Sequence, residues 1–224
     1  MADDNAANSK WRPATQLVRG GTNRSNFAET NEAIFMTSGY IYDTAEQAQR
    51  AFQGEEDRFI YSRFSNPTVG MFEDRMALLE GAESCRATAT GMAAVYASLA
   101  ASVSAGDRLV ASKALFGSCD YICRDILPKF GVESIMVDGT NLAEWEAALS
   151  EPTAAVFMET PSNPQMDIID LPAVAEMAHN VGARVVVDNV FATPILQKPL
   201  ELGADVVVYS GTKHIDGQGR AMGG

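Results

Sequence analysis

Cysteine and histidine are scarce in this chain of 224 residues, which has three of the former and two of the latter. The cysteines, Cys85, Cys119 and Cys123, are odd in number and form no CxxC pair. We therefore expect free thiols in a reducing compartment, with the cytoplasm as the default location. Two histidines far apart in the sequence leave too few ligands for a zinc site, although Cys119 and Cys123 can share a helix face. Neither a disulfide framework nor a metal centre is expected.

Long apolar runs are also lacking, and so is an excess of positive charge. No segment approaches the roughly 18 uncharged apolar residues that a membrane helix needs. The first residues, 1–5, lack the apolar core of a signal peptide. The formal net charge is −12, which disfavours nucleic acid and anionic membranes as main partners. This acidic balance still leaves room for a local basic pocket that binds a phosphate.

Strand-like and helix-like segments alternate along most of the chain. Short apolar runs predict strands at residues 108–111, 132–137, 154–158, 184–187 and 205–209. Helical patterns lie at residues 45–52, 69–79, 90–99, 121–130, 141–149 and 171–180. This alternation predicts an α/β fold whose mostly parallel sheet is covered by helices on both faces.

The two ends of the chain differ from this pattern. Residues 1–62 are polar and mostly irregular, and we expect them to form an N-terminal arm that contacts a partner subunit. Residues 63–224 are expected to form the α/β domain. The sequence closes on two glycines without a terminal helix, so we expect it to be a piece of a longer protein with this domain incomplete at its C-terminal end.

Lys213 lies just beyond the last predicted strand, in the segment Ser-Gly-Thr-Lys-His. A lysine in such a place often keeps its ammonium group in water while its alkyl stem lies along the protein surface. Ser210 and Thr212, however, flank it with hydroxyl groups that suit an anion, and ligands of open α/β sheets bind at the carboxyl ends of strands. A nucleophilic amine at this edge is the group that binds pyridoxal phosphate (PLP) covalently.

Asp188 ends the preceding strand, after three valines. An acid there can simply cap a turn. Alternatively, its carboxylate can hold a proton on the ring nitrogen of PLP, which makes the ring an electron sink. The presence of Lys213 after the neighbouring run favours the second interpretation.

Other candidates are weaker when each is considered alone. Gly91 opens a helix after Thr90, which suits either an anion site at the helix start or an ordinary capped core helix. Phe116 fits both a core position and a ring that stacks on a flat cofactor. Tyr61 and Arg63 place a phenol and a phosphate-compatible guanidinium together, although a solvated loop arginine is equally compatible with the pattern.

Taken together in order, several segments resemble the Cys/Met-metabolism family of fold-type I PLP enzymes. The segments, which span nearly the whole chain, are 18–21, 61–63, 66–68, 91–94, 159–164, 187–189 and 210–213. The resemblance implies the aspartate-aminotransferase-like large domain of a PLP-dependent transferase. It also implies a missing C-terminal domain, which carries the arginine that binds the substrate carboxylate.

The resemblance implies roles for particular side chains. Lys213 is then the Schiff-base lysine, Asp188 the partner of the ring nitrogen, and Asn163 the neighbour of the ring hydroxyl, with Phe116 stacked on the ring. The phosphate would be held by Gly91, Met92, Ser210 and Thr212. Tyr61 and Arg63 would contact the phosphate in the neighbouring subunit, which implies a homodimer or homotetramer with shared active sites.

Within the family, residues 213–220 are most similar to the sulfhydrylases that act on O-succinylhomoserine. The implied reaction is γ-replacement by sulfide, which yields homocysteine and succinate for methionine biosynthesis. Many relatives carry tyrosine where this chain has Phe116, and the absent phenol weakens the case for a carbon–sulfur lyase. A lyase, a cystathionine γ-synthase, an aminotransferase and a non-catalytic binding module remain the alternatives.

Overall fold

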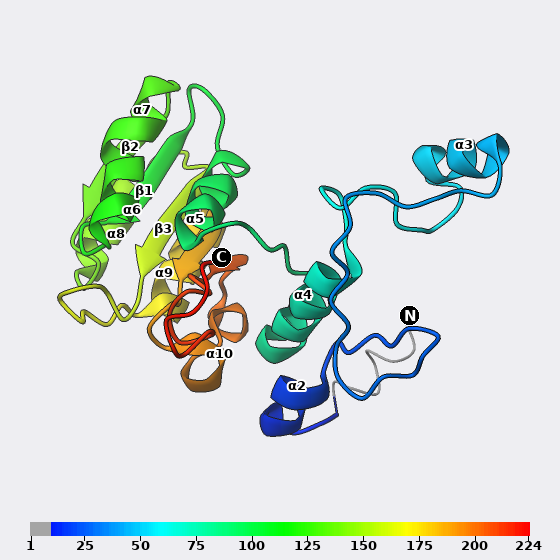
Figure 1. Cartoon of the computed structure of the whole chain (residues 1–224). Helices are drawn as coiled ribbons and strands as arrows, with labels where there is room; N and C mark the ends of the chain where they lie inside the picture. The colour runs from blue at the N-terminus through cyan, green and yellow to red at the C-terminus, as the bar shows by residue number, and fades with distance from the viewer. Residues whose placement is uncertain (1–9) are drawn as a thin grey trace. The chain divides into compact units, whose positions relative to one another are not determined.

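The computed structural model describes residues 10–224, which divide into two compact units. The first unit ends at Arg86 and the second runs from Ala87 to Gly224 (Figure 1). The helix that follows residue 66 contacts the N-terminal helix, so it groups with the arm rather than with the sheet. No helix of residues 10–224 is both long enough and apolar enough to cross a bilayer.

The described part of the first unit, residues 10–86, contains the helices α2 (Pro13–Arg19), α3 (Ala45–Gln53) and α4 (Pro67–Glu80). The sequence patterns anticipate α3 and α4, but α2 was not expected. Asn66 caps α4 by accepting a hydrogen bond from the Thr68 N–H at 2.9 Å, and Gly81 ends it in the left-handed conformation with φ 74°. The Arg75 Nε donates to the Gly20 carbonyl at 2.8 Å, which fixes the chain after α2 against α4.

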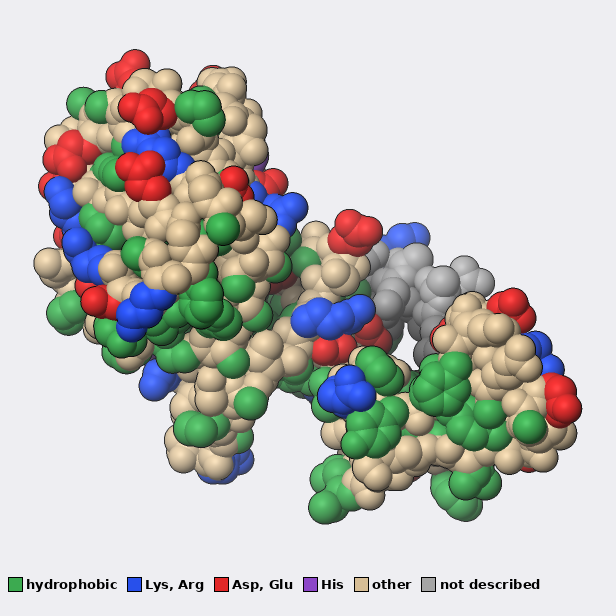
Figure 2. Space-filling view, turned by 90° about the horizontal axis from the view of Figure 1, so that it is seen from above, with side chains coloured by type: hydrophobic (Ala, Val, Ile, Leu, Met, Phe, Trp, Pro, Cys, Tyr) green, Lys and Arg blue, Asp and Glu red, His purple; other side chains and the backbone are tan. Residues whose placement is uncertain are grey.

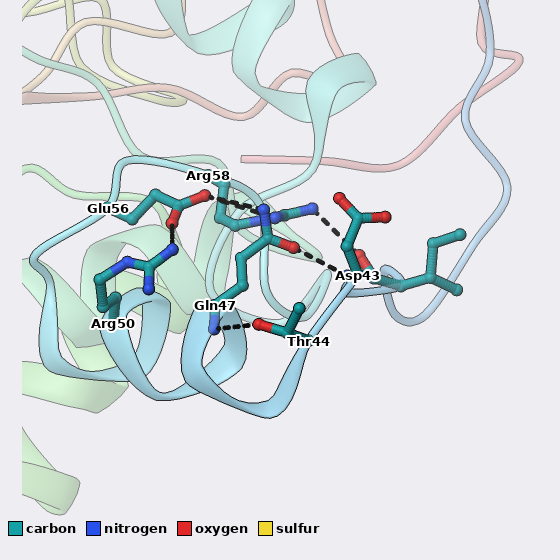
Figure 3. Close-up of polar contacts among 7 residues, drawn as sticks. Asp43, Thr44, Gln47, Arg50, Glu56 and Arg58 are labelled. Carbon is teal, nitrogen blue, oxygen red and sulfur yellow. Dashed lines mark hydrogen bonds and ion pairs between the residues drawn. The ribbon is translucent and has the colours of Figure 1, made fainter.

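Helix α3 is held by polar contacts more than by burial (Figure 3). The Thr44 hydroxyl caps it by accepting from the Gln47 N–H at 3.1 Å. Glu56 pairs with Arg50 at 3.0 Å and with Arg58 at 3.4 Å, which ties the helix to the segment that follows it. The Arg58 guanidinium also stacks on the Tyr42 ring, 5.0 Å from its centroid.

The second unit is built on a five-stranded, fully parallel sheet in the order β2-β1-β3-β4-β5. The strands are β1 (Arg108–Ser112), β2 (Glu133–Val137), β3 (Ala155–Glu159), β4 (Arg184–Asp188) and β5 (Val206–Val208). All five predicted strands are therefore present, within two residues at each end. Parallel pairing confirms the expected α/β class, and it brings every carboxyl end to one edge of the sheet.

Helices cover both faces of this sheet (Figure 1). Helices α8 (Leu142–Ala148) and α9 (Leu171–Asn180) bury Trp145 and Val174 on one face. Helices α5 (Gly91–Ala100) and α6 (Gly117–Tyr121) bury Leu99 and Cys119 on the other. The short helices α10 (Thr193–Leu196) and η2 (Pro199–Leu202) connect β4 to β5.

The helical connection after β1 departs from the expected helix at 121–130. It begins four residues earlier, at Gly117, and contains a π-helical stretch, η1 (Ile122–Ile126), before α7 (Leu127–Lys129). Pro128 has no N–H to donate, and the wider hydrogen-bond spacing lies in the turn just before it. Periodicity alone does not reveal such a change of spacing.

Candidate functional site

The candidate residues of the second unit lie at the carboxyl edge of the sheet. The chain goes from β1 outward to β2 and then returns to β3 on the other side of β1, so the strand order reverses between β1 and β3. Ligands of open α/β sheets bind at such a reversal. Phe116 follows β1, Asn163 follows β3, and Asp188 ends β4.

Asp188 is a buried carboxylate with an acceptor to spare. Its side chain is 7% exposed. One oxygen, Oδ1, accepts the Val190 N–H at 3.0 Å, while no described residue donates to Oδ2. Burial raises the pKa of Asp188 to about 6, against the Val190 hydrogen bond, which lowers it. A cationic N–H donor at Oδ2 would satisfy this group and stabilise its ionised form.

A buried amide network fixes the backbone next to Asp188. The Asn189 side chain, which is fully buried, donates to the Tyr209 hydroxyl at 2.7 Å and to the Gln197 carbonyl at 3.0 Å. Gln197 Nε2 in turn donates to the Asn189 Oδ1 at 2.8 Å. The ends of β4 and β5 are thereby joined, so the acid and the residues that follow β5 keep a defined spacing.

The start of α5 lies directly against Ser210. The Thr90 hydroxyl caps the helix by accepting the Ala93 N–H at 3.1 Å. A Cβ on Gly91, the first helical residue, would lie 2.6 Å from the Ser210 Cβ. Only glycine permits this approach, which sets free N–H groups of a helix start beside a hydroxyl. The next residue, Met92, is partly buried and packs against the core, with its sulfur 4.0 Å from the Cys119 Sγ.

Thr212 and Lys213 lie in the turn at residues 211–216 that follows β5. The Thr212 Oγ1 accepts the Gly223 N–H at 3.2 Å, and the Lys213 N–H donates to the Ser210 carbonyl at 3.2 Å. These contacts hold the turn, while the Lys213 side chain is exposed. The amine is therefore accessible to a ligand at the sheet edge.

Phe116 is not a core residue, since its side chain is 44% exposed. Its backbone N–H donates to Glu159 Oε2 at 2.7 Å, which links the loop after β1 to the end of β3. Sequence reasoning overlooked the Glu159 side chain as a site candidate. The signal was present, because Glu159 ends a buried apolar strand just as Asp188 does.

Asn163 lies in the loop that leaves β3 and is half-buried. The loop is folded around Ser162, whose hydroxyl accepts the Asp167 N–H at 3.0 Å and whose carbonyl accepts the Met166 N–H at 2.8 Å. A fixed loop keeps Asn163 near the edge that carries Glu159.

Tyr61 and Arg63 belong to the first unit, whereas the other candidates belong to the second. Both side chains are exposed. The Arg63 guanidinium lies 5.4 Å from the Tyr61 ring centroid and 4.5 Å from that of Phe64. The pair thus presents a cation backed by aromatic rings.

The second unit fits pyridoxal phosphate in its chemistry. A helix start that only glycine allows, next to a hydroxyl, suits the phosphate, and the free Oδ2 of Asp188 suits a protonated ring nitrogen. The exposed ring of Phe116 suits stacking, and Lys213 provides an accessible amine.

Comparisons with known proteins agree with this fit. Residues 14–224 match the family described as Cys/Met metabolism PLP-dependent enzyme. An O-succinylhomoserine sulfhydrylase from Mycobacterium tuberculosis is 60% identical over 211 residues, which are 94% of this chain and 52% of the relative. An L-methionine gamma-lyase from Porphyromonas gingivalis is 41% identical over 94% of this chain and 53% of the relative. The chain thus spans about half the length of the curated relatives it matches.

A solved structure is similar throughout the described fold. It comes from Campylobacter jejuni, contains N'-pyridoxyl-lysine-5'-monophosphate, and matches with a TM-score of 0.91 at 32% identity. The match covers 96% of this chain and 53% of that chain. About half of that chain's length therefore has no counterpart here. The chain belongs to the Cys/Met-metabolism family of PLP-dependent enzymes.

Proposed function

We propose that the full-length protein catalyses γ-replacement on O-succinylhomoserine with sulfide, giving homocysteine and succinate in methionine biosynthesis. The observation that carries this proposal is the 60% identity, over nearly all of this chain, to an O-succinylhomoserine sulfhydrylase. The reaction breaks the bond between the γ-carbon and the succinyl oxygen and forms a carbon–sulfur bond. It needs no oxidant, because the leaving succinate carries away the electron pair that sulfide replaces.

The proposed role of Lys213 is to bind PLP covalently and then to move protons. When bound, PLP supplies an electron sink for negative charge at the substrate's α-carbon. Once the substrate is bound, the neutral amine of Lys213 takes the proton from the α-carbon and later returns it. The exposed position of this side chain, next to a turn held by Ser210 and Thr212, supports the role.

The other residues bind and orient. Asp188 accepts the ring N–H at its free oxygen, and Phe116 covers one face of the ring. Asn163 lies near the ring hydroxyl. The phosphate is bound at the start of α5 by Gly91 and Met92, with the hydroxyls of Ser210 and Thr212.

Tyr61 and Arg63 are proposed to bind the phosphate in a neighbouring subunit, in a homodimer or homotetramer. The surface of the first unit supports assembly, since many of its large hydrophobic side chains are exposed (Figure 2, right). Phe27, Met36 and Ile41 are each at least 88% exposed. Apolar surface that stays in contact with water does not stabilise a monomer, whereas a partner subunit would bury it.

The sharing of sites can be tested by complementation of full-length variants. Arg63→Ala and Lys213→Ala subunits are expected to be weak or inactive alone. Mixed dimers should regain activity, because one of their two sites then has both an intact Lys213 and the partner's intact Arg63. Lys213→Ala mixed with Asp188→Asn is the control and should show no rescue, since both residues lie in one unit. Equal results from both mixtures would contradict shared sites.

The reaction itself is tested by product analysis on the full-length protein with PLP. O-succinylhomoserine and sulfide should give homocysteine and succinate in equal amounts. The 41% identical L-methionine gamma-lyase makes a lyase the second candidate; it would instead release ammonia and a keto acid from a thioether. If the protein forms cystathionine from cysteine at a higher rate than it forms homocysteine from sulfide, it is a cystathionine γ-synthase. Absence of homocysteine would overturn the proposal.

A further inference from the structure

Glu159 and Asp188 are direct neighbours on adjacent parallel strands, since β3 and β4 pair them in register. Side chains alternate between the faces of a strand. Phe157 and Val186, two residues earlier on each strand, both pack in the cluster beneath α5 and α6. Glu159 and Asp188 therefore face the same side, toward these helices, and bring two carboxyl groups together in the interior.

The Glu159 carboxyl group is only half satisfied. Oε2 accepts the Phe116 N–H at 2.7 Å, whereas Oε1 is buried and has no hydrogen-bond partner. The residue is 1% exposed. A buried carboxylate with an unpaired oxygen carries a large desolvation cost, whereas a protonated carboxyl group does not.

The surrounding charges act in the same direction. Burial first, and then the negative charge of Asp188, raise the pKa of Glu159 to about 7, while the backbone N–H groups of Phe116 and Asn163 lower it. The Asn163 N–H lowers the pKa of Glu159, although it does not form a hydrogen bond to Oε1. Burial and both carboxylates also raise the pKa of the Cys119 thiol, which faces them from α6. Two neighbouring carboxyl groups in such a site do not ionise together.

We propose that Glu159 is a positioning residue that remains a neutral acid beside an ionised Asp188 and anchors the backbone of Phe116. This inference rests on the proposed PLP site. The proton resides on Oε1, because Oε2 accepts a hydrogen bond. Only Asp188 then carries a negative charge that can interact with the ring nitrogen. The hydrogen bond from the Phe116 N–H to Glu159 also fixes the loop that carries the Phe116 ring, where the strand order reverses between β1 and β3.

The test compares Glu159→Gln with Glu159→Ala in the full-length protein, using PLP itself as the ligand. Glutamine is neutral and can still accept the Phe116 N–H, so PLP affinity should stay within about twofold, and the pH at which the visible absorbance of bound PLP changes should not move. Alanine leaves the N–H without an acceptor, and affinity should fall about tenfold. In infrared difference spectra at pH 6, the wild type should show a protonated carboxyl band that Glu159→Gln lacks.

Glu144 offers a matched control in the same unit. Its Oε2 also accepts a backbone N–H, that of Asp138 at 2.8 Å, but Glu144 is only partly buried and pairs with Lys113 at 3.3 Å. Glu144→Gln and Glu144→Ala should therefore leave PLP affinity within about twofold of the wild type.

Three results would overturn the inference: Glu159→Gln as weak as Glu159→Ala, Glu159→Ala as tight as the wild type, or no carboxyl band. If Glu159→Ala does not fold, the affinity and infrared spectrum of Glu159→Gln still decide. Borohydride labelling of Lys213 with PLP separates the two proposals. If Lys213 is labelled but Glu159→Gln binds PLP weakly, only the proposed role of Glu159 is refuted. If Lys213 is not labelled, the proposed function is refuted.

Discussion

Replacing Gly91 with alanine tests the proposed phosphate site at its narrowest point. The added Cβ would lie 2.6 Å from the Ser210 Cβ, 2.8 Å from its Cα and 2.9 Å from its Oγ. Carbon atoms in ordinary contact are about 3.5–4.0 Å apart. The start of α5 and the segment after β5 must therefore separate by roughly 1 Å.

The size of the effect follows from two opposing contributions. Overpacking of a closely packed site costs about 1–3 kcal/mol. Alanine regains at most about 1 kcal/mol as a better helix former than glycine. With the full helix-forming gain, the expected net loss in the free energy of unfolding is about 0–2 kcal/mol. PLP affinity should also fall, by at least about tenfold, because the helix N–H groups and the Ser210 hydroxyl move apart and no longer contact one phosphate together.

The assay is PLP titration of full-length apoprotein, together with denaturant unfolding without PLP. Gly70→Ala is the matched control, because Gly70 also lies in a helix and a Cβ there meets nothing within 4 Å. It should be neutral or stabilise the protein by up to about 1 kcal/mol and leave PLP affinity unchanged. If Gly91→Ala binds PLP as tightly as the wild type, the start of α5 is not the phosphate site.

Two further predictions concern the acidic pair. Asp188→Asn should lower PLP affinity and nearly abolish turnover, measured by titration and by homocysteine formation, because a neutral amide cannot hold the proton on the ring nitrogen; unchanged turnover would contradict the assignment. For Glu159, a pKa raised to about 7 in the folded state means that the native protein holds a proton that the unfolded chain releases near pH 4.5. This contribution to stability is complete below about pH 4 and is lost as the pH rises through about 7, so between pH 5.5 and 8 the Glu159 carboxyl group alone should account for a loss of about 2 kcal/mol. Glu159→Gln should lack this loss in pH-dependent unfolding, and an identical pH dependence in both proteins would contradict the raised pKa.

Local signals in the sequence account for much of the fold. Three valines before Asp188 predict a buried strand, and Thr90 before an alanine-rich segment predicts a capped helix; both features are present. These signals succeed because neighbouring residues determine them. The π-helical spacing before Pro128 was not predictable from apolar periodicity, which is the same for an α-helix that contains one wider turn.

The site was less accessible to sequence reasoning, because its main contacts join distant residues. Phe116 and Glu159 are 43 residues apart, and their hydrogen bond depends on β1 lying beside β3. The burial of Glu159 next to Asp188 likewise depends on strand register. The roles of Tyr61 and Arg63 in a neighbouring subunit stay predictions.

Covalent labelling tests the central claim most directly. The full-length protein is incubated with PLP, reduced with borohydride, digested, and mapped by mass spectrometry. The account predicts one pyridoxyl group per subunit, on the peptide that contains Lys213, and none in Lys213→Ala. A label on another lysine, or no label in the wild type, would contradict it.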